Sequence, residues 1–246
     1  MGRCPRSRYG TTVRQDAVRN RELVLAAARE VYAEQGVEAP LDVIAQRAGV
    51  GNATLYRRFP DRAALIEAVF HDTLTAAIEA GEEARRAPDA WAGLVDYATG
   101  IFAGLAGDRG AIDLMTTSLT GVPSLEALHA HNAETYRVLL ARCREDGTVR
   151  PDVTVEDLLL ALAALGRAVP AAEVAAPGSW RRLLTLLLDG LRAGAAGALP
   201  GSPLSGVQLA RALGGLHGGP GSRRSLEGRG TSRRAPKDVL AARPRP

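Results

Sequence analysis

The most constraining feature of the sequence is a helix that ends at a glycine and restarts within three residues. Residues 48–62 read AGVGNATLYRRFPDR. Gly49 favours the left-handed backbone conformation that ends a helix at little cost, and Val50 is placed to pack between two helices. The polar segment 51–54 begins a second short helix, which Pro60 ends. Two short helices joined by a glycine-containing turn form a helix-turn-helix, whose second helix can enter the major groove of DNA.

Apolar residues at helical spacing continue on both sides of this turn. Leu23, Ala27 and Val31 recur every four residues, which predicts a helix from Asn20 that Gly36 ends. Aromatic residues make up only 4% of the chain, so we expect an all-α fold with a core of Leu, Ala and Val. The other expected helices cover residues 41–48, 52–59, 61–78, 89–105, 111–119, 124–145, 155–169 and 179–194.

The two ends of the chain are basic and the middle is acidic. Residues 1–62 carry 11 basic and 7 acidic side chains, residues 63–196 carry 11 and 18, and residues 197–246 carry 9 and 2. A basic N-terminal module suits a polyanionic partner such as DNA, and an acidic middle does not. The terminal segments have little periodicity, so residues 1–17 are expected to form a flexible arm and residues 195–246 a disordered basic tail.

The cysteines and histidines indicate no disulfide and no metal site. Cys4 and Cys143 form no C-x-x-C pair, and the four histidines lack metal-ligand spacing. Because no hydrolase, zinc-protease, phosphate-loop or dinucleotide motif is present, we expect no cofactor and no enzyme. Asp113, His129 and His131 are the one conceivable acid–base set, and nothing in the sequence orients them. The chain also shows no apolar signal segment and no run of ~18 apolar residues, which predicts a cytoplasmic protein without a membrane segment.

The last two expected helices are apolar on most of their faces. Leucines nearly encircle both of them, and such a helix must be buried on most faces. One small domain can hardly cover both, whereas the same pair from a second subunit can, in a four-helix bundle; a core within one chain is the alternative. Pro170 and Pro177 are expected to bracket the linker between the two helices. The expected residues of a homodimer interface are Leu158, Leu162, Leu165, Leu184, Leu187 and Leu191.

A stretch of about 60 residues matches a known pattern. It contains RELVLAAAREVYAEQGVE and, further on, DVIAQRAGVGNATLYRRFPDRAALIEAVF. This text resembles the TetR (tetracycline-repressor-like) family of bacterial transcriptional regulators. The resemblance implies a three-helix DNA-binding domain at residues 18–66 and a helical ligand-binding and dimerisation domain at residues 67–194. Pro40 stands where the family usually has a hydroxyl cap, and Gly51 and Asn52 replace the usual start of the recognition helix.

The resemblance implies a ligand-responsive repressor. Such a protein binds a double-stranded DNA operator as a homodimer and releases it when a small molecule, unknown here, binds the C-terminal domain. A transcriptional activator, or a helix-turn-helix protein without a small-molecule ligand, is the alternative. Asn52 can bond adenine and Ala53 can meet a thymine methyl group, while neighbouring side chains are placed for phosphate.

These implied roles fall on two groups of residues. The expected DNA-binding residues are Gly51, Asn52, Ala53, Thr54, Tyr56, Arg57, Arg58 and Arg62. Each arginine taken alone could instead be a solvated surface residue. The expected ligand-binding residues are Trp91, Tyr97, Phe102, Met115, His129 and Tyr136, each with ordinary core packing as its alternative.

Overall fold

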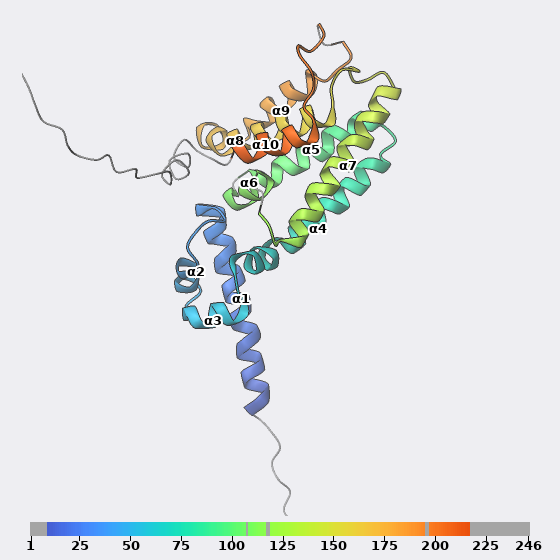
Figure 1. Ribbon diagram of the computed structural model, residues 1–246. Coiled ribbons are helices and arrows are strands. Elements are labelled where there is room, and N and C mark those ends of the chain that lie inside the picture. The colour runs from blue at the N-terminus through green and yellow to red at the C-terminus, as the bar shows by residue number, and fades with distance from the viewer. Residues whose placement is uncertain (1–8, 107, 117–118, 195–196, 217–246) are drawn as a thin grey trace, which may run out of the picture.

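The computed structural model describes residues 9–106, 108–116, 119–194 and 197–216, and within them it is built from helices (Figure 1). Its one extended contact there is an isolated antiparallel bridge between Val149 and Arg192. The all-α expectation is therefore confirmed. The helices are α1 (Tyr9–Gln35), α2 (Leu41–Arg47), α3 (Asn52–Arg58), α4 (Arg62–Arg86), α5 (Ala90–Leu105), α6 (Arg109–Thr116), α7 (Pro123–Glu145), α8 (Val155–Ala175), α9 (Trp180–Asp189) and α10 (Gly206–Gly215).

The helices α1, α2 and α3 pack around a shared apolar core at the N-terminal end of the molecule (Figure 1). Val31, Ile44, Leu55 and Phe59 are all buried in it. Because Leu55 and Phe59 lie one helical turn apart, this burial leaves the other faces of α3 outward. Gly49, with φ of +67°, makes the turn between α2 and α3, so the predicted helix-turn-helix is present.

The long helix α4 joins this part of the chain to the larger helical domain. Asp61 caps it by accepting a hydrogen bond from the backbone N–H of Ala64 at 2.8 Å, which stabilises the first turn of the helix. The N-terminal half of α4 lies in the same core as α1 to α3, and that core also takes in Leu114 of α6 and Leu125 of α7. The expected domain boundary at residue 66 thus falls within α4.

A second apolar core lies among α5, α7, α8 and α9. Its largest side chain is Trp180, 1% exposed, whose ring centroid is 6.0 Å from that of Phe102. Tyr97 and Tyr136 pack with their ring centroids 5.4 Å apart. This core forms the body of the larger domain, and α10 lies along α8 beside it (Figure 1).

Both terminal segments contain more helix than the sequence suggested. Helix α1 begins at Tyr9, so residues 9–17 of the expected arm are helical. Within residues 195–246, α10 is a capped helix: Ser205 and Gln208 form a reciprocal capping box, and Leu209 is buried. The capping box and the buried leucine stabilise this helix despite its Gly- and Pro-rich surroundings. Residues 1–8, 195–196 and 217–246 of the expected arm and tail lie outside the described residues.

Helix α8 corrects one further expectation. It continues through Pro170 to Ala175, so the linker to α9 does not start at that proline. Pro170 is exposed. By length and mean hydropathy (1.7), α8 is also the one described helix that could cross a membrane. Its Leu158 and Val169 are buried in the second core, so one face of this helix packs inside the protein.

Replacing Gly36 by alanine is expected to destabilise the protein more than replacing Gly49. Both glycines have positive φ, and alanine there costs about 1 kcal/mol or more. A Cβ at Gly36 would also lie 2.3 Å from Oδ2 of Asp113, whereas a Cβ at Gly49 meets nothing within 4 Å. Urea unfolding of the two variants measures the difference. Equal losses of unfolding free energy would show that Asp113 moves aside without cost.

Candidate nucleic-acid interface and cavity

Helix α3 presents a polar and basic face on the outside of the molecule. Tyr56 is 52% exposed although it is aromatic. The N-cap residue of the helix is Gly51, which forms no side-chain cap, so no capping side chain covers the first turn. Arg57 folds back along the helix, with its Nε 3.3 Å from the Ala53 carbonyl oxygen. The exposed predicted residues of this face are Gly51, Asn52, Ala53, Tyr56, Arg57 and Arg58, with Thr54 half-buried beside them.

Arg62 differs from the other predicted DNA-binding residues. Its guanidinium donates hydrogen bonds to the carbonyl oxygens of Val37, at 2.5 Å, and Ala39, at 2.6 Å. These bonds tie the connection between α1 and α2 to the start of α4, so the side chain positions α2 from within the domain. Sequence spacing could not find this role, because the partners lie more than 20 residues earlier in the chain.

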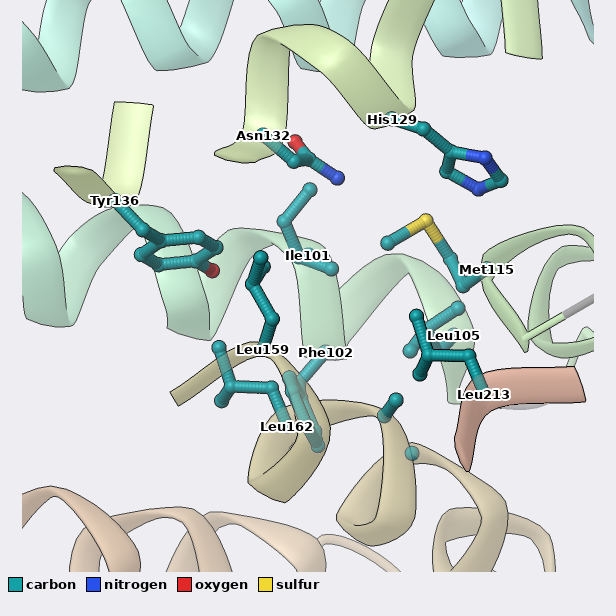
Figure 2. Close-up of a pocket in the computed structure, with 12 residues that line it drawn as sticks. Ile101, Phe102, Leu105, Met115, His129, Asn132, Tyr136, Leu159, Leu162 and Leu213 are labelled. Carbon is teal, nitrogen blue, oxygen red and sulfur yellow. The ribbon is translucent and has the colours of Figure 1, made fainter. Parts of the chain in front are cut away.

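A cavity of about 200 Å³ lies in the larger domain, between α5, α7 and α8, with α6 and α10 at its side (Figure 2). Four of the six predicted ligand residues line it: Phe102, Met115, His129 and Tyr136. Asn132 and Leu213 also line it and were not predicted. A polar residue on the inward i, i+3, i+7 face of α7 was the available signal for Asn132. The remaining lining residues are Ile101, Leu105, Leu159, Leu162, Ala163 and Gly166.

A second cavity, of about 300 Å³, adjoins the first between α4, α5, α6 and α7. The two share the side chains of Ile101, Leu105 and Met115. Tyr97, another predicted ligand residue, lines this second cavity. Trp91 lines neither cavity: the guanidinium carbon of Arg192 lies 3.9 Å from the centroid of its ring.

The polar side chains of the first cavity sit on α7 and are uncharged. Asn132 is 5% exposed, and its Oδ1 accepts a hydrogen bond from the Tyr97 hydroxyl. Nε2 of His129 lies 3.2 Å from the Leu114 carbonyl oxygen, and burial lowers the pKa of His129 below its ordinary value. Burial also raises the pKa of the Tyr136 hydroxyl. Both groups are therefore neutral at pH 7.

Helix α6 touches both the cavity and the N-terminal domain. Oδ2 of Asp113 accepts a hydrogen bond from the backbone N–H of Val37 at 3.2 Å. Its Oδ1 lies 3.5 Å from Nη1 of Arg167 on α8. Met115, two residues further on, lines both cavities. A displacement of α6 at the cavity would therefore reach the loop that precedes α2.

The residues that could have formed an acid–base set point to separate partners. Asp113 contacts Val37, His129 contacts the Leu114 carbonyl, and His131 lies 3.1 Å from Nη2 of Arg85. In the described ranges, no group of three or more His, Cys, Asp or Glu residues could hold a metal ion.

Comparisons with known proteins match both parts of the chain. Residues 24–69 match the family model for bacterial regulatory proteins of the tetR family, and residues 88–193 match the SbtR-like transcriptional regulator C-terminal domain. The first match covers the helix-turn-helix, and the second covers α5 to α9 and most of the cavity lining. A comparison with curated proteins gave no match.

Solved structures of similar proteins include three regulators. A TetR transcription regulatory protein from Mycobacterium vanbaalenii is 32% identical over 73% of this chain and 99% of its own, with a TM-score of 0.41. A TetR transcriptional regulator from Streptomyces coelicolor is 29% identical over 71% and 99%, with a TM-score of 0.48. The regulator FadR from Bacillus subtilis, in complex with stearoyl-CoA, is 19% identical over 72% and 100%, with a TM-score of 0.54.

Both halves of the structure thus agree with one assignment. The helix-turn-helix carries the exposed face of α3, and a helical domain with an internal cavity follows it. The family models cover both, and a relative of 32% identity is matched over nearly its whole length. The chain belongs to the TetR family of bacterial regulatory proteins, whose members are DNA-binding transcriptional regulators and not enzymes.

Proposed function

We propose that this protein is a repressor that binds a DNA operator as a homodimer and releases it when a small molecule occupies the cavity in its larger domain. The observation that carries the proposal is the placement of α6, which lines the cavity through Met115 and holds the N-terminal domain through Asp113. A ligand that moves α6 can therefore change how the DNA-binding helices are held. Ligand binding and DNA binding then favour different populations of the same protein.

The proposed contacts with DNA lie on α3. Asn52 can make two hydrogen bonds to an adenine edge, and Ala53 can contact a thymine methyl group. Thr54, Arg57 and Arg58 are placed for phosphate, and Tyr56 for a phosphate or a base edge. Gly51 offers no side chain and only its backbone. Arg62 is not included, because its guanidinium is held by two carbonyl groups of its own domain.

The proposed dimer interface is the outer surface of α8 and α9. Four of the predicted interface residues, Leu158, Leu162, Leu184 and Leu191, are buried in the chain's own core. A residue already buried in its own subunit cannot be covered by another. Leu165 and Leu187 are half-buried and pack partly against that core, so only part of each side chain is available to a second subunit.

The apolar residues that remain outward are different ones. Leu183 and Leu186 are exposed on α9, the latter at 61%. On α8, an exposed stripe of alanines lets a second helix approach closely; its members are Ala164, Ala168, Ala171 and Ala175. Only 22% of the most apolar part of α8 is buried within one chain. The same helices of a second subunit would cover this surface and complete a four-helix bundle.

Titration of the purified protein against the DNA flanking its own coding region tests the proposal. An unrelated fragment of equal length is the control, and both are titrated at several salt concentrations. We expect tight binding to the flanking DNA and a preference for it that survives at high salt, because base contacts do not depend on counterion release as phosphate contacts do. A transcription assay from the same promoter should then show lower output when the protein is added.

Two results would count against this function. Weak binding of equal affinity to both fragments, with a steep dependence on salt, would indicate contacts with phosphates only. Higher transcription on adding the protein would identify an activator. In the first case α3 does not read sequence in this DNA, and in the second the direction of regulation is reversed.

A further inference from the structure

The wall of the first cavity that α7 forms contains an amide group that lacks a partner. Asn132 uses its Oδ1 to accept from Tyr97, while its Nδ2 has no hydrogen-bond partner among the described residues. The side chain is 5% exposed, and its amide nitrogen points into the cavity (Figure 2). Because this N–H group is open to the cavity, it can donate to a ligand that brings an acceptor.

The Tyr136 hydroxyl lies one helical turn from Asn132 on the same wall. Its ring packs on Tyr97, its hydroxyl end faces the cavity (Figure 2), and it forms no hydrogen bond with the described residues. Since burial keeps this hydroxyl protonated, it too can donate. The α7 wall of the cavity therefore carries two donors, Asn132 Nδ2 and the Tyr136 hydroxyl.

The rest of the cavity offers neither charge nor further donors. Its opposite wall is hydrocarbon, from Leu159 and Leu162 of α8 and Phe102 of α5 (Figure 2). Within the described part of the chain, no Asp, Glu, Lys or Arg lines it, and its His129 is neutral. A carboxylate or phosphate would be desolvated here without a cation, and an ammonium group without an anion.

The adjoining cavity extends this apolar space. The flexible side chain of Met115 lies between the two and can yield to a ligand. The second cavity is lined mainly by Leu, Ala and Gly, and the carboxylate of Asp96 is exposed at its edge. A hydrocarbon group can therefore pass from the first cavity into the second.

We infer that the effector is an uncharged carbonyl compound with a hydrocarbon body, such as a ketone, ester or lactone, whose carbonyl oxygen accepts a hydrogen bond from the α7 wall, where Asn132 Nδ2 and the Tyr136 hydroxyl are the donors. This inference rests on the proposed function, because it names the ligand class of the same cavity. It assigns recognition to two residues of α7 and shape selection to the leucines of α8.

Three ten-carbon probes test the ligand class directly. Butyrophenone is a ketone, butylbenzene lacks the carbonyl oxygen, and 4-phenylbutanoate carries a negative charge. Their dissociation constants are measured by displacement of the neutral fluorophore N-phenyl-1-naphthylamine from the full-length protein. We expect the ketone to bind at least 10-fold more tightly than either of the others, because only the ketone brings an acceptor to the donors of α7 without bringing a charge.

Variants of α7 separate recognition from packing. Tyr136→Phe removes one hydroxyl, and Asn132→Leu removes the amide. Each is expected to weaken ketone binding about fivefold or more, which is the effect of losing one hydrogen bond. The dissociation constant of butylbenzene should change by less than about twofold. Thr135→Val is the matched control: Thr135 is buried on the same helix, has no hydrogen-bond partner for its hydroxyl, and faces Gly81 of α4. If Asn132→Leu does not fold, the change in ketone affinity of Tyr136→Phe alone tests recognition by α7.

Three results would overturn the inference: equal binding of the anion and the ketone, equal binding of the hydrocarbon and the ketone, or no displacement by any of the probes. Operator titration of the same preparation without probe keeps the two proposals apart. Specific DNA binding with no ketone preference would reject the ligand class alone. Ketone binding without specific DNA binding would reject the proposed function alone.

Discussion

Tyr56→Ala is expected to weaken binding to the operator by about 1–3 kcal/mol, which is about 5- to 150-fold in the dissociation constant. The reason is its position on α3, where its side chain is 52% exposed beside Asn52 and Arg57. An aromatic side chain held this far out of the core contributes little to folding, so the unfolding free energy should change by less than about 0.5 kcal/mol. Fluorescence anisotropy with labelled operator DNA measures the affinity of each variant.

Two controls show which kind of contact Tyr56 makes with DNA. Tyr56→Phe keeps the ring and removes the hydroxyl, so it separates a hydrogen bond to DNA from stacking or steric contact. Binding to the unrelated DNA fragment shows whether the loss is specific: a base contact changes mainly the operator affinity, and a phosphate contact weakens both. An unchanged operator affinity in a folded Tyr56→Ala protein would reject the assignment of α3 as the recognition helix.

The DNA-binding end of the molecule could be predicted because its signals are local. Gly36 and Gly49 end helices, and Asp61 caps one, each within a few residues of the change that it causes. The spacing of Leu55 and Phe59 then fixed which face of α3 is buried. The bond from Arg62 to Val37 crosses 25 residues, and no local pattern reports such a contact.

The cavity and its link to the DNA-binding end could be predicted only in part. Of the candidate ligand residues, His129 and Tyr136 line the first cavity, whereas Trp91 packs its ring under Arg192. A buried amide such as Asn132 differs from a surface amide only through the helices packed around it. Helix α10, which lines part of the cavity, was not predicted. The Gly- and Pro-rich composition of the segment indicated disorder, and the capping pattern at Ser205 is too short to outweigh it.

For the apolar helices α8 and α9, the spacing of apolar residues does not determine which face packs within the chain. A helix with leucine on most faces must be covered on most faces, but the sequence does not say which face its own chain covers. The structure assigns Leu184 and Leu188 to the chain's own core and leaves Leu183 and Leu186 outward. A test of the dimer must therefore change an outward residue, because a charge at the half-buried Leu187 would also disturb the core.

Leu186→Glu is expected to produce monomers without unfolding the protein. In the proposed dimer this side chain is covered by the second subunit, and burying an unpaired carboxylate there costs about 3 kcal/mol or more, roughly 100-fold or more in the dimer dissociation constant. In the monomer it is 61% exposed, so the substitution has little effect on the core. Sedimentation velocity from nanomolar to micromolar protein measures the dissociation constant, and thermal unfolding confirms the fold.

Thr185→Glu provides the matched control on the same helix. Thr185 is exposed on the flank of α9 that also carries Arg181 and Asp189, away from the apolar flank of Leu183 and Leu186, so the same charge should leave the dimer intact. Operator affinity should fall with Leu186→Glu and not with Thr185→Glu, because a monomer reaches only one of two half-sites. A Leu186→Glu protein that dimerises as tightly as the wild type would place the interface on another surface.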